Sequence, residues 1–257
     1  ASDVYKRQVC GMLANGDTGD GKLPSEETLV SYVVRELAHE KDLHGKKVLV
    51  TAGPTQEAID PVRYITNHST GKMGYALAEA AMLRGAEVTL ISGPTAIEPP
   101  MFVNVIPIIS AQEMFEKVAT NATENDIIIK AAAVADYRPK EVCDEKIKKS
   151  DHDTEIELER TTDILAYLGK NKGKTFLCGF SMETENMLEN SRRKLDKKNL
   201  DMIVANNLKD KGAGFGVDTN LITIITRDRE LQLELMSKQD AANCILDEII
   251  RKIGNRE

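Results

Sequence analysis

Short apolar runs alternate with helical segments along the chain from residue 46 onward. The run 47–52 (KVLVTA) is rich in β-branched residues and stops at Gly53-Pro54. After a long connection, apolar residues in 73–84 recur at helical spacing, and a second apolar run follows at 86–92. Runs that are apolar on both faces are typical of buried strands in parallel sheets. The alternation therefore predicts an α/β fold, a Rossmann-like three-layer αβα arrangement around a mostly parallel sheet.

The same pattern predicts the other elements of this domain. Further strands are expected at 103–109, 126–132, 175–180 and 201–205, and further helices at 111–119, 163–168, 183–198 and 240–253. Two runs, 221–226 and 231–235, flank a turn-like segment and predict an antiparallel hairpin at an edge of the sheet.

The beginning of the chain has a different character. Residues 1–22 show no periodicity and contain several glycines, so we expect a tail. Pro24-Ser25-Glu26-Glu27 predicts the start of a helix with Ser25 as its N-cap and one apolar face, followed by a polar linker. We therefore divide the chain into 1–44, a tail and linker helix, and 45–257, the main domain.

Composition excludes several classes of function. With 34 basic and 41 acidic residues the net charge is −7, which disfavours a nucleic-acid or anionic-membrane binder. No apolar run approaches the ~20 residues that span a bilayer and no signal peptide is evident, so we expect a cytoplasmic protein. The four cysteines and four histidines show no metal-ligand or disulfide spacing, and Cys178 lies in an apolar run and is expected to be buried.

The segment 67–74 (NHSTGKMG) carries the strongest local signal. It is rich in glycine and hydroxyl groups and runs directly into a helix, whose N-terminal amides suit phosphate. It matches neither G-x-x-x-x-G-K-[ST] nor G-x-G-x-x-G. The residues alone leave open a structural alternative, a capping loop with Ser69 or Thr70 as N-cap.

Two further segments follow strand ends, where ligands of open α/β sheets gather. Asp60 and Arg63 come after the first strand, and the Arg63 guanidinium suits an anionic group, although a surface salt bridge to Asp60 is equally compatible. Asp136 follows the small residues 131–135 and could hold a metal-bound phosphate or an exocyclic amine, or simply cap a helix or turn.

Two groups of lysines supply positive charge in this acidic chain. The run 146–149 (KIKK) is either a solvated surface or a mobile lid beside a phosphate site. Lys194 and Lys198 are four residues apart and share one helix face, where an anion bound between them would relieve their repulsion.

Taken together, these segments resemble phosphopantothenoylcysteine synthetase, the second half of a bacterial bifunctional coenzyme A biosynthesis flavoprotein. The resemblance covers roughly 45–251, and its motifs lie in order at 50–74, 130–139 (KAAAVADYRP), 146–149 and 179–186 (GFSMETEN). Residues 14–17 resemble the end of the preceding decarboxylase half, the half that binds FMN. Because Asn15 replaces the family's cysteine there, we expect no decarboxylase activity from this chain.

The resemblance implies a ligase that acts in two steps. The phosphopantothenate carboxylate attacks CTP, releasing pyrophosphate and leaving an acyl-cytidylate. The amine of L-cysteine then displaces CMP. A triphosphate must be neutralised in the first step, which implies Mg²⁺ and lysines. The resemblance also implies a homodimer in which the lysine loop reaches across the interface.

The resemblance assigns roles by position. Lys146 matches the lysine that stabilises charge during cytidylate formation, and Asn67 matches the asparagine that turns over the acyl-cytidylate. Asp136 would also hold the metal. The implied nucleotide contacts are Lys130, Ala131, Ala132, Asp136, Lys146, Thr162, Asp163, Ile164, Leu165, Phe180, Lys194 and Lys198. The implied phosphopantothenate contacts are Asp60, Arg63, Asn67, Ser69 and Ala133. Thr162 stands where the family usually has proline.

Two other functions remain open. A nicotinamide- or flavin-dependent oxidoreductase would need G-x-G-x-x-G after the first strand and an acid ending the second, and the sequence has neither. An inactive regulatory subunit is the other alternative. Asn67 and Lys146 are both intact, which counts against it, because an inactive subunit would not need them. The preference for CTP over ATP is taken from the bacterial family, because no residue distinguishes the two bases.

Overall fold

The computed structural model describes residues 9–12, 17–149, 155–183, 185–207, 214 and 216–254, apart from the side chains of residues 183 and 207. Contacts divide the chain into two compact units, Ala1–Glu40 and Lys41–Glu257. Asn15, the expected replacement for a cysteine, lies outside the described residues.

The first unit contains a hairpin and a helix. β1 (Val9–Met12) pairs antiparallel with β2 (Thr18–Lys22), a hairpin that the sequence, read there as a tail without periodicity, did not predict. Glycines interrupt both strands, and a glycine has no side chain to contribute to the alternation that marks a strand. α1 (Glu26–Leu37) begins as predicted, because the Ser25 hydroxyl accepts a hydrogen bond from the Thr28 amide at 3.3 Å.

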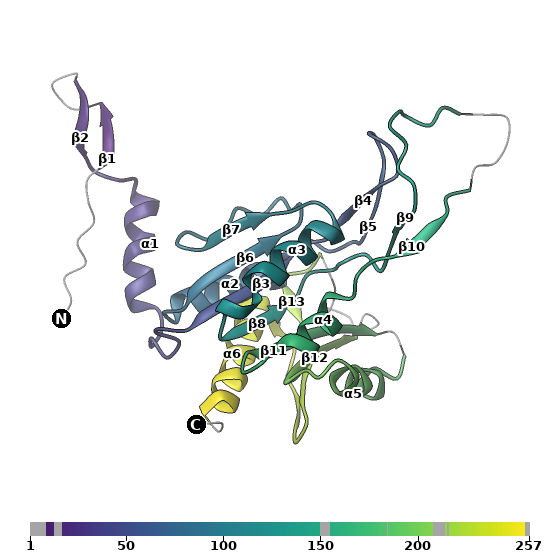
Figure 1. Ribbon diagram of the computed structural model, residues 1–257. Coiled ribbons are helices and arrows are strands. Elements are labelled where there is room, and N and C mark those ends of the chain that lie inside the picture. The colour runs from purple at the N-terminus through teal and green to yellow at the C-terminus, as the bar shows by residue number, and fades with distance from the viewer. Residues whose placement is uncertain are drawn as a thin grey trace. The chain divides into compact units, whose positions relative to one another are not determined.

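An eight-stranded sheet forms the centre of the second unit, in the order β15-β14-β12-β11-β8-β3-β6-β7 (Figure 1). Pairing is parallel from β12 through to β7 and antiparallel at β12–β14 and β14–β15, which confirms the predicted edge hairpin. The strands are β3 (Lys47–Ala52), β6 (Glu87–Ser92), β7 (Asn104–Pro107), β8 (Ile127–Lys130), β11 (Phe176–Glu183), β12 (Met202–Asn207), β14 (Ile222–Thr226) and β15 (Glu230–Gln232).

Helices cover both faces of this sheet. They are α2 (Lys72–Leu83), α3 (Ala111–Asn121) with the 3₁₀ turn η1 (Ala122–Glu124), α4 (Ile164–Asn171), α5 (Met187–Lys197) and α6 (Lys238–Gly254). α5 is shorter than predicted, because residue 183 belongs to β11. Within the described ranges, every helix is too short or too polar to cross a bilayer.

Two separate apolar clusters show which helices lie on which face. Val48 and Val50 pack in one cluster with residues of α2 and α6, whereas Leu49 packs in the other with residues of α3, α4 and α5. Successive side chains of a strand point to opposite faces, so the two clusters are the two sides of the sheet. This confirms the three-layer αβα arrangement. Cys178 is fully buried in the first cluster, as predicted.

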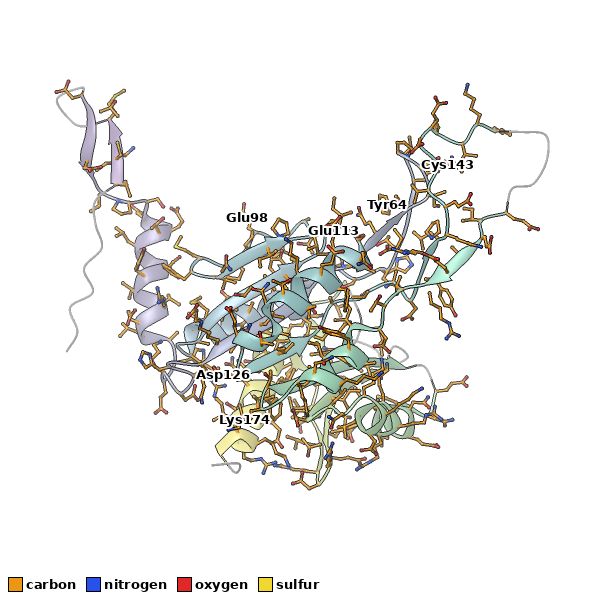
Figure 2. The ribbon with its side chains drawn as sticks, in the orientation of Figure 1. Tyr64, Glu98, Glu113, Asp126, Cys143 and Lys174 are labelled. Atoms are coloured by element: carbon orange, nitrogen blue, oxygen red, sulfur yellow. The ribbon has the colours of Figure 1, made fainter. Side chains whose placement is uncertain are left out.

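Among the described residues of the second unit, three short antiparallel pairs lie outside the central sheet. They are β4 (Gln56–Ala58) with β5 (Tyr64–Thr66), β9 (Tyr137–Pro139) with β10 (Leu158–Arg160), and β13 (Thr219–Asn220) with β16 (Met236–Ser237). The first two pairs contact each other through β4 and β9 and extend away from the sheet (Figure 1). We call residues 56–66, 137–149 and 155–160 the arm. Figure 2 shows Tyr64 and Cys143 on it.

Candidate active site

Two cavities lie where β3, β8 and β11 end. The first, of about 420 Å³, is lined by Lys130, Ala132, Val134, Ala135, Asp136, Tyr137, Arg160, Thr161, Thr162, Asp163, Ile164, Leu165, Phe180, Lys194 and Lys198. The second, of about 390 Å³, is lined by Asn67, Ser69, Thr70, Gly71, Lys72, Met73, Gly74, Ala131, Ala132, Ala133, Asp136, Phe180, Ser181, Met182, Asn206, Gly214, Asn220 and Lys238. Ala132, Asp136 and Phe180 belong to both linings, so the cavities share a wall.

The segment 131–136 is held in place by the end of β3. Its Ala132 amide donates to the Thr51 hydroxyl at 3.1 Å, and the Ala135 amide donates to the Thr55 hydroxyl at 3.0 Å. The Ala133 amide donates to the Gly53 carbonyl at 2.9 Å. These bonds fix the backbone of the shared wall, and the small side chains leave it open to a ligand.

The first cavity combines lysines with two carboxylates. Lys198 Nζ lies 2.8 Å from Asp163 Oδ2, and Asp163 also caps α4 by accepting the Ala166 amide at 3.0 Å. Burial raises the pKa of Asp163, but hydrogen bonds from Lys198 and Ala166 outweigh that effect and lower it overall. The predicted neighbours Lys194 and Lys198 both line the cavity, which suits an anion.

Lys130 ends β8 within the same cavity. Desolvation, reinforced by the nearby charge of Lys198, lowers the pKa of Lys130 to about 8. Its ammonium form is therefore in balance with the neutral amine just above neutral pH, and an anion placed beside it would favour the charged form.

The second cavity is built around the loop that leads into α2. Gly71 has a left-handed backbone (φ 82°) and is the N-cap, with no capping side chain, so the alternative with Ser69 or Thr70 as N-cap is wrong. A Cβ on Gly74 would lie 2.6 Å from the Ala52 Cβ. The glycine thus lets the first turn of α2 pack against the end of β3, which brings the helix N-terminus to the cavity.

Asn67 sits on this loop and is tied to the shared wall. Its side-chain Nδ2 donates a hydrogen bond to the Ala133 carbonyl at 3.0 Å. Ser69 accepts a hydrogen bond from the Gly71 amide at 3.3 Å. The structure therefore brings the predicted phosphopantothenate contacts Asn67, Ser69 and Ala133 to one cavity.

Asn206, Asn220 and Lys238 line the second cavity without having been predicted. The side-chain oxygens of Asn206 and Asn220 are buried and have no hydrogen-bond partner in the described structure. Lys238 Nζ donates to the carbonyls of Gly214 at 3.2 Å and Thr219 at 3.1 Å. For Asn206, its position directly after the predicted strand 201–205 is the signal that sequence reasoning could have used.

The structure leaves three predicted residues outside both cavities. Lys146 is exposed on the arm. The Asp60 carboxylate is completely buried beneath Arg63, with which it forms an ion pair, so the salt bridge considered from the sequence is present. Arg63 shields Asp60 but remains half exposed. The predicted contacts of Asp60 and Arg63 with phosphopantothenate stay predictions.

At the shared wall of the two cavities, the described residues offer one carboxylate, Asp136, rather than a cage for a metal ion. Among the described residues, no group of three or more His, Cys, Asp or Glu side chains could hold a metal. Asp136 is exposed at the shared wall. Mg²⁺ commonly takes one or two protein carboxylates and draws its other ligands from phosphate and water, so Asp136 fits an ion that arrives with a nucleotide.

Comparisons with known proteins agree with this architecture. Residues 43–253 match the family described as DNA/pantothenate metabolism flavoprotein C-terminal domain. The coenzyme A biosynthesis bifunctional protein CoaBC of Bacillus subtilis (strain 168) is 50% identical over 243 residues, which are 93% of this chain and 60% of that protein. CoaBC of Vibrio vulnificus (strain YJ016) is 44% identical over 250 residues, 96% of this chain and 62% of that protein. The chain thus spans about 60% of the length of these relatives.

Solved structures show the same fold. The C-terminal domain of a CoaBC protein aligns with a TM-score of 0.73 and 45% identity, covering 84% of this chain and 100% of that one. A mutant of Cab2, in complex with phosphopantothenate-cysteine, aligns with a TM-score of 0.69 at 17% identity, covering 89% and 94%, and shows the fold alone. By the extent of the family match and the identity to CoaBC, the chain belongs to the family of DNA/pantothenate metabolism flavoprotein C-terminal domains.

Proposed function

We propose that this chain is a ligase domain that joins 4'-phosphopantothenate to L-cysteine at the expense of CTP, in coenzyme A biosynthesis. The observation that carries the proposal is the pair of cavities with a shared wall at Ala132, Asp136 and Phe180. A two-step synthetase needs a nucleotide and an acid side by side, so that the carboxylate can reach the α-phosphate. Membership of the family supports the same activity.

In the first step the nucleotide occupies the first cavity. Lys130, Lys194 and Lys198 neutralise the phosphates, and Asp136 would hold a Mg²⁺ ion, which would supply further positive charge against the triphosphate. The phosphopantothenate carboxylate attacks the α-phosphorus, the bond to the β-phosphate oxygen breaks, and pyrophosphate leaves. The protein forms no covalent bond and contributes position and charge.

In the second step the acyl-cytidylate lies across the shared wall, with its acyl end in the second cavity. Asn67 lines that cavity and is bonded to the Ala133 carbonyl. It holds the acyl carbonyl while the cysteine amine attacks. The new C–N bond replaces the C–O bond to the phosphate, CMP leaves, and the amine loses a proton to solvent.

Lys146 stabilises charge in the first step from a position outside the cavities of its own chain. The arm extends away from the sheet (Figure 1). Lys146 is exposed on the arm. We therefore propose a homodimer in which the arm of one protomer brings Lys146 to the first cavity of the other. This geometry would explain a lysine that lines neither cavity of the single chain.

The longer relatives carry additional sequence, and their names describe a bifunctional protein. We propose that residues 1–44 connect this domain to a decarboxylase half, which would bind FMN, and that residues 45–257 are the synthetase. Asn15, which would remove decarboxylase activity, lies outside the described residues.

The proposal is tested by following both steps in the purified protein. With 4'-phosphopantothenate and Mg²⁺, CTP should give pyrophosphate without cysteine, and addition of cysteine should give the coupled product by mass spectrometry. Competition among all four nucleoside triphosphates would measure the base preference. If NADH raised the melting temperature and CTP with Mg²⁺ did not, the oxidoreductase alternative would be favoured. Binding of CTP without pyrophosphate release would favour an inactive subunit.

A further inference from the structure

The Asp60 carboxylate lies on the turn between β4 and β5 and is completely buried. Its Oδ1 accepts hydrogen bonds from the amides of Val62 at 2.8 Å and Arg63 at 2.9 Å. Its Oδ2 accepts from Arg63 Nε at 3.1 Å and from the Arg63 Nη2. The hydrogen bond from the Arg63 guanidinium holds the pKa of Asp60 well below its usual range, so this buried group is ionised at neutral pH.

The same carboxylate also binds the backbone of the lysine segment. Asp60 Oδ2 accepts a hydrogen bond from the Ile147 amide at 3.1 Å, and Arg63 Nη2 donates to the Ile147 carbonyl at 2.9 Å. Nearby, the Cys143 amide donates to the Ile59 carbonyl at 3.0 Å. Both peptide groups of Ile147 are therefore fixed by the Asp60–Arg63 pair.

The hydrogen bonds from Asp60 and Arg63 to Ile147, which we call the anchor, also constrain the backbone of Lys146. The amide of Ile147 belongs to the peptide plane that joins Lys146 to Ile147, so fixing it fixes the backbone from which the lysine side chain extends. Residues 145–149 lie in no helix or strand, which leaves them without the regular backbone hydrogen bonds of such elements. Without an anchor, ordering this segment would cost conformational entropy each time Lys146 is needed.

We infer that Asp60 is a positioning residue that acts on the first step by holding the backbone of Lys146, an inference that rests on the proposed function. The carboxylate is buried and lines neither cavity, so it serves the segment that bears the lysine. Arg63, with about half of its side chain exposed, can hold the same segment and still meet an anionic ligand.

The first test is the substitution Asp60→Asn in the whole chain. An amide presents one oxygen instead of two, so it cannot accept both the Val62 and Arg63 amides, which donate to Oδ1, and the Arg63 side chain and Ile147 amide, which donate to Oδ2. The expected result is a fall in kcat for pyrophosphate release of about 10²-fold with little change in the KM for CTP, as for other misplaced catalytic groups. Glu157→Gln removes another arm carboxylate, paired with Lys140 at 2.9 Å, and should leave kcat unchanged. Equal losses in both variants would overturn the inference.

A double-mutant cycle separates positioning from general destabilisation. If Asp60 acts through Lys146, adding Asp60→Asn to Lys146→Gln should cause no further loss of pyrophosphate release. Losses that multiply in the double variant would mean that Asp60 acts independently of Lys146, and the inference would be wrong.

A second pair of variants covers the case in which Asp60→Asn fails to fold. Ile147→Pro deletes the N–H that Asp60 accepts, whereas Ile147→Ala keeps it, and both lie in a segment without helix or strand. Only the proline variant should lose kcat, and equal activity in the two would contradict the inference.

Hydrogen exchange of the Ile147 amide measures the anchor without any assay of activity. Asp60→Asn should speed this exchange while the core amides stay protected. Faster exchange with unchanged pyrophosphate release would overturn the role in the first step. If the unsubstituted protein released no pyrophosphate from CTP, the proposed function itself would fail, and the positioning role of Asp60 in the first step with it, whatever the exchange rates show.

Discussion

The side chain of Asn67 donates a hydrogen bond of 3.0 Å to the carbonyl of Ala133, a residue 66 positions later in the chain. The bond joins the loop that opens α2 to the wall shared by the two cavities. It therefore couples the two segments that the proposed second step needs at a fixed distance.

Asn67→Asp should uncouple the two steps. A carboxylate cannot donate to the Ala133 carbonyl, so the acyl end of the intermediate would be held poorly while its formation continued. We expect pyrophosphate release at nearly the usual rate, loss of the cysteine adduct, and an acyl-cytidylate detectable by mass spectrometry. Asn121→Asp is the control, because Asn121 donates in the same way to the Lys117 carbonyl but lies on α3, away from both cavities. If no intermediate is detected, Asn67 acts earlier than proposed.

Lys146→Gln should slow the first step by about 10²–10³-fold, the usual cost of losing one charge-stabilising donor. The side chain is exposed, so the melting temperature should not change. Lys174→Gln is a suitable control, because Lys174 precedes β11 at the opposite end of the strands from the cavities (Figure 2). Unchanged pyrophosphate release in Lys146→Gln would refute the assigned role.

Affinity for CTP should fall as the pH rises past about 8, because Lys130 has a pKa of about 8 and its ammonium form is lost above that value. Bound phosphates raise this pKa, so binding takes up a proton, and the loss cannot exceed about tenfold per pH unit for one proton. Calorimetry in buffers of different ionisation enthalpy would measure the uptake. Lys130→Gln should abolish it, and a pH dependence that persists in this variant would assign the proton elsewhere.

The ligand-free protein should respond to pH with the opposite sign. Because folding lowers the pKa of Lys130 from 10.5 to about 8, the unfolded chain binds more protons between these values. The contribution of Lys130 to the free energy of unfolding therefore rises with pH in this window. Comparison with Lys130→Gln in denaturant titrations at roughly pH 8 and pH 10, two values within this window, would isolate the contribution of Lys130. An equal response in both proteins would contradict the assignment.

Gly74→Ala should destabilise the domain by about 1–3 kcal/mol, the usual cost of overpacking. The new Cβ would lie 2.6 Å from the Ala52 Cβ and 2.9 Å from the Thr51 carbonyl oxygen, so α2 would have to move away from β3. The Asn67 loop would move with it, and synthetase activity should fall together with the melting temperature. Gly254→Ala, where a Cβ meets nothing within 4 Å, is the matched control. Equal melting temperatures in the two variants would show that α2 can adjust without cost.

The sheet could be predicted because each strand and helix shows its own apolar pattern within a short stretch of sequence. A strand such as β3, buried on both faces, reads as an uninterrupted apolar run, and the helices that cover it show an apolar stripe. The β1–β2 hairpin was missed because glycine conceals the alternation of its side chains. β4 and β9 were missed because each has only three residues, too few to establish a period.

The cavities could be predicted in part, for a similar reason. Residues at strand ends, such as Asp136, are brought together by any parallel sheet, so their convergence follows from the fold class. The burial of Asp60 could not be predicted, because it depends on a contact with Ile147, 87 positions away in the chain. The unpaired side-chain oxygens of Asn206 and Asn220 could not be predicted, because a missing hydrogen-bond partner is visible only once the surroundings are known.

The wall common to the two cavities affects how many nucleotides would be consumed for each product molecule. A mixed anhydride of a carboxylic acid and a phosphate is quickly destroyed by water, and each molecule lost wastes one triphosphate. Because Ala132, Asp136 and Phe180 border both spaces, the proposed acyl-cytidylate would meet the cysteine amine without leaving the protein. Hydrolysis then competes only with the arrival of cysteine, so the ratio of CMP formed to product formed should approach one as cysteine becomes abundant.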